Sequence, residues 1–185
     1  LAFVVRLKRR REMRRLANDL GFTLARWFGP FPSLEPGRLF HDSAQTSHLM
    51  EGEYRGRRVI AYDAGPVGGK ISARSRRHGW LGDRGKTSIC LMRLDSPYPN
   101  VDVRPRTLLG INDSDNRITT GEVRFESDEF NRAFRVSCRD RRFVYNLCHP
   151  RVMEWLLARR GLNLAVVGGW LALKDGEEWS PKEFV

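Results

Sequence analysis

Short runs of strand-forming residues, separated by turn residues, set the strongest limit on how this chain can fold. Strand-forming residues such as Tyr54 and Val59 flank Arg55-Gly56-Arg57, so residues 46–63 are expected to form a β-hairpin. A second hairpin is expected over 164–173 around Gly168-Gly169. Further strands are expected at 87–94, 100–104, 122–125 and 133–138. Few helical patterns separate these runs, so the sequence predicts an α+β fold in which an antiparallel β-sheet has helices packed on one face.

Three helices are expected beside the sheet. His149-Pro150 opens one, because proline in the first turn loses no hydrogen bond there. Its apolar stripe is formed by Val152, Met153, Leu156 and Leu157. A second helix occupies the N-terminus and ends near Gly21. Ser180-Pro181 has the order typical of a third helix start.

The N-terminus has an unusual order of apolar and basic residues. Residues 1–5 are all apolar, and clustered cations follow at once. A secretory signal has the reverse order. Apolar residues running into arginines are typical of the cytoplasmic end of a transmembrane helix. Since five residues cannot cross a core that needs roughly 20, we expect the chain to begin inside a span. The cations expected to contact anionic lipid are Arg6, Lys8, Arg9, Arg10, Arg11, Arg14 and Arg15.

Charge supports this interpretation without excluding two others. The formal net charge is +11 and the pI is about 10.4. Residues 1–26 carry more than half of that excess, so the remainder is close to an ordinary soluble domain. A solvated basic helix on a soluble protein, and a nucleic-acid-binding arm, remain alternatives.

These patterns divide the chain into three parts. Residues 1–21 are expected to be the end of a membrane helix and a basic juxtamembrane helix. Residues 22–45 are expected to be a linker, because 29–40 hold three prolines and two glycines. Residues 46–185 are expected to form the α+β domain. This arrangement predicts a single-pass protein of the inner (cell) membrane with its folded domain on the cytoplasmic side.

A second basic segment lies in the stretch 64–86, which is expected to be a loop. Its cations make a candidate anion-binding loop, with Trp80 among them as a surface on which a base could stack. A solvated loop, or one lying against acidic lipid, explains the same residues. The candidate residues are Arg74, Arg76, Arg77, Arg84 and Lys86.

Motifs for catalysis or cofactor binding fail on their spacing. The segment 82–87 resembles a phosphate-binding loop, but Trp80 stands where its first glycine is needed. The segment 113–118 resembles a calcium loop, but Ile118 replaces the required glycine. The four histidines share no metal-ligand spacing, and three cysteines cannot form a disulfide framework. The sequence therefore predicts no catalytic residues, no metal, no cofactor and no enzymatic activity.

One stretch carries a family resemblance. Phe130, Phe134 and Val136 fit a Phe-x-x-x-Phe-x-Val pattern, which Asp140 and a Leu-x-x-Pro-x-x-Met-x-x-Leu-Leu run follow. The stretch 126–157 resembles a bacterial, actinobacterial-like family of unknown function whose members have N-terminal membrane helices and a cytoplasmic domain. The resemblance extends loosely over 46–174 and implies no catalytic residues. The arginine bias, with 28 arginines among 33 basic residues, agrees with such a source.

Together these features favour a membrane-tethered cytoplasmic domain that works as a non-enzymatic scaffold, regulator or accessory subunit of a membrane complex. Its expected partners are anionic lipids and a protein. The alternative is a soluble basic module that binds nucleic acid, which the sequence favours less.

Overall fold

The computed structural model describes residues 2–25, 29–30, 44–66, 87–106, 121–175 and 179–180. Ten described strands form one sheet, and every pairing in it is antiparallel. The order is β1-β3-β4-β5-β10-β9-β6-β8-β7, with β2 paired to β3. The strands are β1 (Thr23–Leu24), β2 (Gly29–Pro30), β3 (Ala44–Tyr54), β4 (Arg57–Pro66), β5 (Thr87–Arg93), β6 (Val101–Pro105), β7 (Glu122–Val123), β8 (Phe134–Cys138), β9 (Asn163–Val167) and β10 (Trp170–Lys174). The predicted antiparallel, α+β character is thus confirmed.

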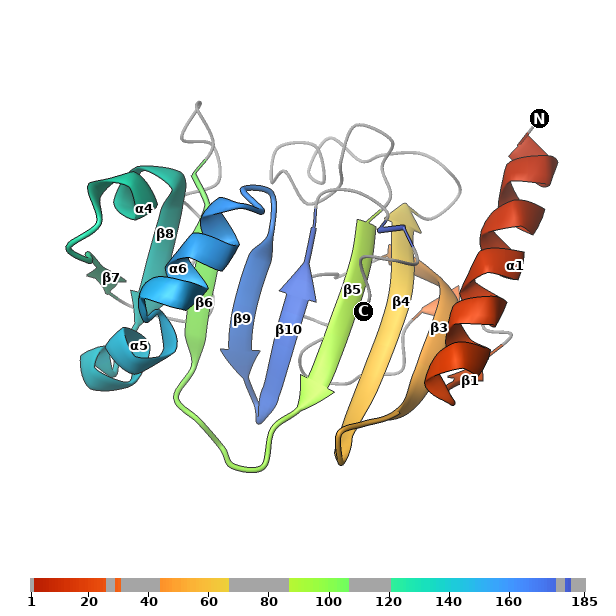
Figure 1. The fold of residues 1–185 in the computed structure, drawn as a ribbon, viewed down its shortest axis with the longest axis horizontal. Coiled ribbons are helices and arrows are strands. Elements are labelled where there is room, and N and C mark those ends of the chain that lie inside the picture. The colour runs from red at the N-terminus through yellow and green to blue at the C-terminus, as the bar shows by residue number, and fades with distance from the viewer. Residues whose placement is uncertain are drawn as a thin grey trace.

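Both predicted hairpins form, and their turns show why. Arg55 and Gly56 connect β3 to β4 with φ angles of 52° and 75°. Gly168 and Gly169 connect β9 to β10 with φ angles of 56° and 76°. Two successive positive φ values match the twist of the flanking strands, and glycine adopts them without steric cost. The β9–β10 hairpin enters the middle of the sheet, between β5 and β6, and so joins its two halves (Figure 1).

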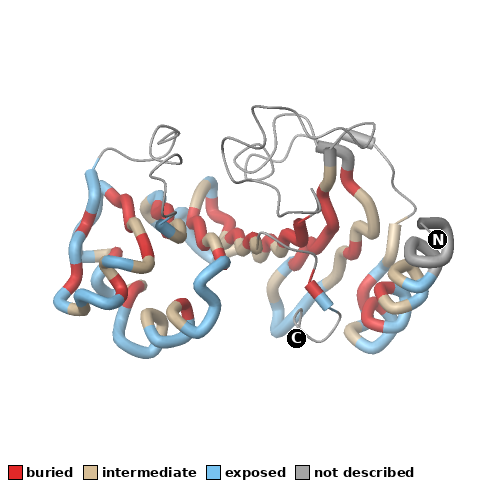
Figure 2. Tube along the Cα trace, turned by 90° about the horizontal axis from the view of Figure 1, so that it is seen from above, coloured by how far each residue is buried: buried red, intermediate tan, exposed pale blue. Residues whose placement is uncertain are grey.

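The helix α1 (Ala2–Leu20) lies at one end of the sheet (Figure 1). It stops at Gly21, whose φ of 69° allows the amide of Phe22 to bond the carbonyl of Ala17 at 2.7 Å. Met13, Leu16 and Ala17 are buried against residues of β3 and β4. Figure 2 shows this helix buried on the side that faces the strands and exposed on the other.

Three further helices cover the other end of the sheet: α4 (Asp128–Ala133), α5 (Arg141–Leu147) and α6 (Pro150–Leu157). The predicted helix at His149-Pro150 is confirmed as α6, whereas the sequence did not predict α4 and α5. They begin at Ser127 and Asp140, whose side chains accept the amides of Phe130 and Phe143. Their buried residues share one core with strands β6, β8 and β9.

The strand register shows that α1, at one end of the sheet, and α4–α6, at the other end, pack on the same face. Val59 of β4 lies opposite Met92, which lies opposite Leu171, and the row continues through Val166 to Val101. Residues directly opposite each other in an antiparallel sheet point to one side. α1 packs beside the first of these residues and α4–α6 beside the last.

The predicted linker differs from the structure, and the predicted C-terminal helix lies outside the described residues. Strands β1 and β2 fall within the stretch predicted as a linker and pair with β3. The expected helix after Ser180 lies outside the described residues. No helix among the described residues combines the length and the apolar character that crossing a bilayer requires.

Candidate functional site

The cations of α1 fall into two groups. Lys8, Arg11, Arg14 and Arg15 are exposed, and the Lys8 side chain is 79% exposed. Arg10 is half-buried, and the side chain of Arg6 lies outside the described residues. The helix therefore has an apolar side buried against the sheet and an exposed basic side, the pattern of an amphipathic helix on the surface of a globular domain.

Arg9 differs from its neighbours because its side chain is only 11% exposed and points toward the sheet. Its Nε and Nη2 donate to the two carboxylate oxygens of Asp63 on β4 at 3.1 and 3.0 Å. Its Nη1 donates to the carbonyl of Trp179 at 2.5 Å. A lipid contact by Arg9 would break this buried pair, so Arg9 does not fit the predicted lipid contact; for the exposed cations that contact stays a prediction.

Asp63 is the centre of a buried polar cluster drawn from five parts of the chain. Besides Arg9, it accepts Ser88 Oγ at 2.7 Å and lies 3.1 Å from His48 Nδ1. Ser88 in turn accepts the Trp179 amide at 2.9 Å. Burial by itself would raise the pKa of Asp63, but the hydrogen bonds from His48, Arg9 and Ser88 and the charge of Arg9 outweigh it and lower the pKa.

A β-bulge brings His48 into this cluster. The register of β3 against β4 shifts between Ser47 and Met50, and His48 takes a φ of 53° there. The extra residue lets His48 join Ser47 and Met50 on the face of Asp63, while Leu49 packs on the opposite face.

The cluster is built to hold structure and does not have the geometry of a catalytic triad. A nucleophilic serine needs a hydrogen bond to a base such as histidine. Here Ser88 donates to a carboxylate whose pKa is lowered and accepts a backbone amide. His48 is bonded to the same carboxylate through its other oxygen. The bonds join α1, β3, β4, β5 and the segment at Trp179.

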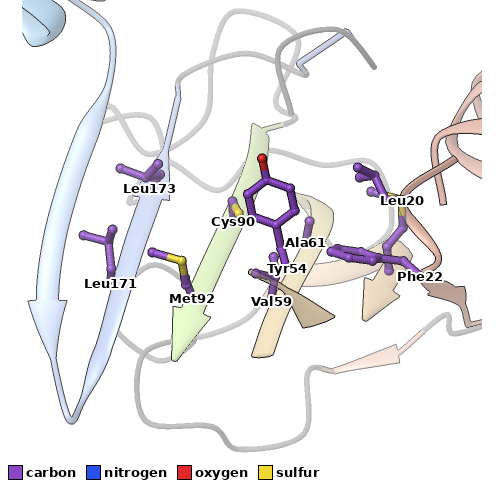
Figure 3. Close-up of a pocket in the computed structure, with 10 residues that line it drawn as sticks. Leu20, Phe22, Tyr54, Val59, Ala61, Cys90, Met92, Leu171 and Leu173 are labelled. Carbon is purple, nitrogen blue, oxygen red and sulfur yellow. The ribbon is translucent and has the colours of Figure 1, made fainter. Parts of the chain in front are cut away.

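An apolar groove, shown in Figure 3, is lined by residues of the same face. Ala61 and Cys90 of its lining lie two residues along β4 and β5 from Asp63 and Ser88 of the cluster. Its volume is about 240 Å³. Alternate residues of β4, β5 and β10 form the floor. Residues of α1 and β3, together with Phe22 between α1 and β1, form one wall. The lining residues are Leu20, Phe22, Met50, Tyr54, Val59, Ala61, Cys90, Met92, Leu171 and Leu173. None of these side chains carries a charge.

Phe22 reaches the groove wall because Gly52 has no side chain. A Cβ at Gly52 would lie 2.2 Å from Cδ1 of the Phe22 ring. The helix stop at Gly21 and the small residue on β3 together place the ring. Tyr54 stands at the rim and is 41% exposed.

The cysteines are free in the structure, and none has the character of a reactive thiolate. Burial raises the pKa of Cys90, which lines the groove, to about 11. It raises the pKa of Cys148 to about 12, with a contribution from Cys138. These values disfavour nucleophilic chemistry at neutral pH.

The opposite face of the sheet holds a second buried group of charges. Arg104 Nε lies 2.6 Å from the Asp102 carboxylate. Burial raises the pKa of Asp102 despite that neighbour. Lys174 is 4% exposed, and burial followed by repulsion from Arg104 lowers its pKa to about 7, with Asp175 acting in the other direction.

Among the residues of the two buried polar clusters, around Asp63 and around Asp102, the sequence predicted a role only for Arg9. That role was contact with anionic lipid. The predicted anion-binding residues Arg74, Arg76, Arg77, Arg84 and Lys86 lie outside the described residues. Within the part of the chain that the structure describes, no group of His, Cys, Asp and Glu side chains is arranged to hold a metal ion.

Comparison with known proteins gives one match of fold. No family model matches the chain, and no curated protein matches it. Among solved structures, it is similar to the crystal structure of the mycobacterial trehalose monomycolate transport factor A, TtfA, with a TM-score of 0.54 and 11% sequence identity. The likeness covers 90% of this chain and 80% of that one. At this level of identity the likeness describes the fold alone.

Proposed function

We propose that this chain is the membrane-associated, non-enzymatic domain of an accessory factor for a membrane transport complex. The exposed basic side of α1 is the observation that carries the proposal. It would rest on the anionic inner leaflet and hold the sheet close to a protein partner in the membrane. The structure with the similar fold is that of a transport factor, which supports an accessory role over a catalytic one.

The charge of α1 is large enough to matter for this role. Each cation near an anionic leaflet contributes about 1 kcal/mol. The four exposed cations Lys8, Arg11, Arg14 and Arg15 therefore contribute about 4 kcal/mol, roughly a thousandfold in partitioning. In the further proposal of a single-pass protein, residues 1–5 would belong to the inner-membrane span, with the sheet on the cytoplasmic side.

Co-sedimentation with vesicles tests the proposal. The protein should bind vesicles that contain phosphatidylserine, bind pure phosphatidylcholine weakly, and detach as salt rises. Reversal of Lys8, Arg11, Arg14 and Arg15 to Glu should abolish binding. A matched control reverses four exposed arginines at the other end of the sheet, namely Arg132, Arg139, Arg141 and Arg142.

Equal losses in the two quadruple variants would refute a specific role for α1, because only overall charge would matter. Tight, salt-dependent retention by duplex DNA without vesicle binding would favour the nucleic-acid-binding alternative instead.

A further inference from the structure

The outer side of α6 presents a row of two arginines with a tryptophan between them. Arg151, Trp155 and Arg159 follow one another at intervals of four residues, so they lie along one side of the helix and its last turn. All three are exposed, and Trp155 is 39% exposed. The other side of α6 is anchored in the core by Leu156. These three residues, called the α6 row below, therefore face solvent while the helix beneath them is fixed.

Within the described part of the chain, the two arginines of the α6 row have no carboxylate partner. The next residue, Arg160, does have one, because it pairs with Glu129 at 2.9 Å. The guanidinium carbon of Arg159 instead lies 4.7 Å from the centre of the Trp155 ring, a cation–π contact. This contact holds both side chains in place before a partner arrives, which lowers the entropy cost of binding.

We propose that the α6 row is the docking surface for an acidic helix of a protein partner. Tryptophan and arginine are the residues that most often dominate binding energy at protein interfaces, and a guanidinium group binds a carboxylate through two parallel hydrogen bonds. Arg151 and Arg159 are eight residues apart, about 12 Å along a helix axis. A partner helix matches this spacing with two acidic residues seven or eight positions apart and an apolar residue midway, to pack on Trp155.

The surface of α6 favours a helix over other acidic occupants. An extended peptide gains no main-chain hydrogen bonds from a helix, whose backbone groups bond one another, whereas a second helix needs none. A nucleic acid carries a charge at every phosphate and would meet the carboxylate of Glu154, which is exposed beside Arg151. Arg159 also covers one face of the ring on which a base would stack.

The position of the α6 row fits the proposed function, on which this inference rests for the existence of a partner. Helix α1 lies at one end of the sheet, and α6 covers strands in the other half (Figure 1). A partner bound to α6 therefore leaves the exposed cations of α1 free to contact lipid.

Photocrosslinking in cells that produce the full-length protein tests the proposal. p-Benzoylphenylalanine is placed at Ala158, which is exposed and lies between Trp155 and Arg159 in the sequence. Mass spectrometry of the adduct should identify one protein and map the crosslink to a helical segment with two acidic residues seven or eight positions apart. The same probe at Asn18, which is exposed on α1, should not form this adduct.

Two charge changes of equal size separate the α6 row from overall charge. Arg151→Glu combined with Arg159→Glu should lower the adduct yield by about tenfold or more, and Trp155→Ala should do the same. The control, Arg132→Glu combined with Arg142→Glu, changes exposed arginines of α4 and α5 and should leave the yield unchanged. Urea denaturation verifies that each variant is folded.

A charge swap then tests the pairing itself. Changing the two mapped acidic residues of the partner to Arg should restore the adduct in the variant that carries Glu at 151 and 159. The proposal is overturned by no adduct at position 158, an adduct with lipid or nucleic acid, or a mapped segment without the acidic pair. Equal losses in the two double variants, an unchanged yield in Trp155→Ala, or no rescue by the swap would also overturn it.

The docking surface and the membrane association fail separately. Vesicle binding without the adduct refutes the docking surface and leaves the membrane association standing. The adduct and its rescue, in a protein that does not bind vesicles, refute the membrane association and support the docking surface.

Discussion

Replacing Asp63 with Asn is expected to destabilise the domain more than any exposed charge change. Asp63 accepts two bonds from Arg9 and one from Ser88, and it contacts His48. Its side chain is 2% exposed and that of Arg9 is 11% exposed. The variant leaves a buried guanidinium without its counter-charge. Removing one member of a buried pair costs about 3–5 kcal/mol, so we expect a loss of that size in the free energy of unfolding.

Urea denaturation followed by tryptophan fluorescence measures this loss, and two controls interpret it. Glu129→Gln breaks a pair with Arg160 in which both side chains are more than half exposed, and should cost less than about 1 kcal/mol. The double variant Arg9→Met, Asp63→Asn should cost less than the sum of its single changes, because each single change already breaks the pair.

The dependence on pH gives a second measurement of the same group. The pKa of Asp63 is lower in the folded protein than its ordinary value of 3.8, so the carboxylate stabilises the fold above that value. The contribution is lost as pH falls from about 4 through the folded-state pKa. Asp63→Asn should lack this acid-range loss. A variant within about 1 kcal/mol of wild type, or additive single changes, would refute the reasoning.

Two other changes test the groove wall and the opposite face by urea denaturation. Gly52→Ala puts a methyl group 2.2 Å from the Phe22 ring and should cost about 1–3 kcal/mol; a cost that persists in a Phe22→Leu background would show that the ring is not the cause. Lys174 has a folded-state pKa of about 7 against an ordinary 10.5, so the unfolded chain binds more protons between those values and stability should rise with pH across them. Lys174→Met should remove that rise, and an unchanged pH profile would contradict the assignment.

The parts of the fold that local signals specify could be predicted from sequence. Gly56 and the Gly168-Gly169 pair favour a turn between strand-forming residues, and Pro150 is suited to a helix start. Helices α4 and α5 were missed because each is under two turns long, and their formation depends on burying Phe130 and Val144 in a core assembled from distant strands.

The polar cluster around Asp63 could not be predicted from the sequence, for a different reason. Arg9, His48, Asp63, Ser88 and Trp179 are spread over almost the whole chain, so no local spacing connects them. Arg9 lies among six other cations of similar appearance in residues 6–15. One signal was available: Asp63 interrupts a run of apolar residues over 59–64, and a carboxylate buried in such a strand needs a partner.

The central place of the β9–β10 hairpin has a consequence for how the protein comes into being. A ribosome releases β3, β4 and β5 long before residues 163–174 appear. Until then the outer side of β5 offers unused amides and carbonyls, the kind of edge to which foreign strands add. We therefore expect the nascent chain to depend on chaperone shielding until residues 163–174 have been made and can complete the sheet.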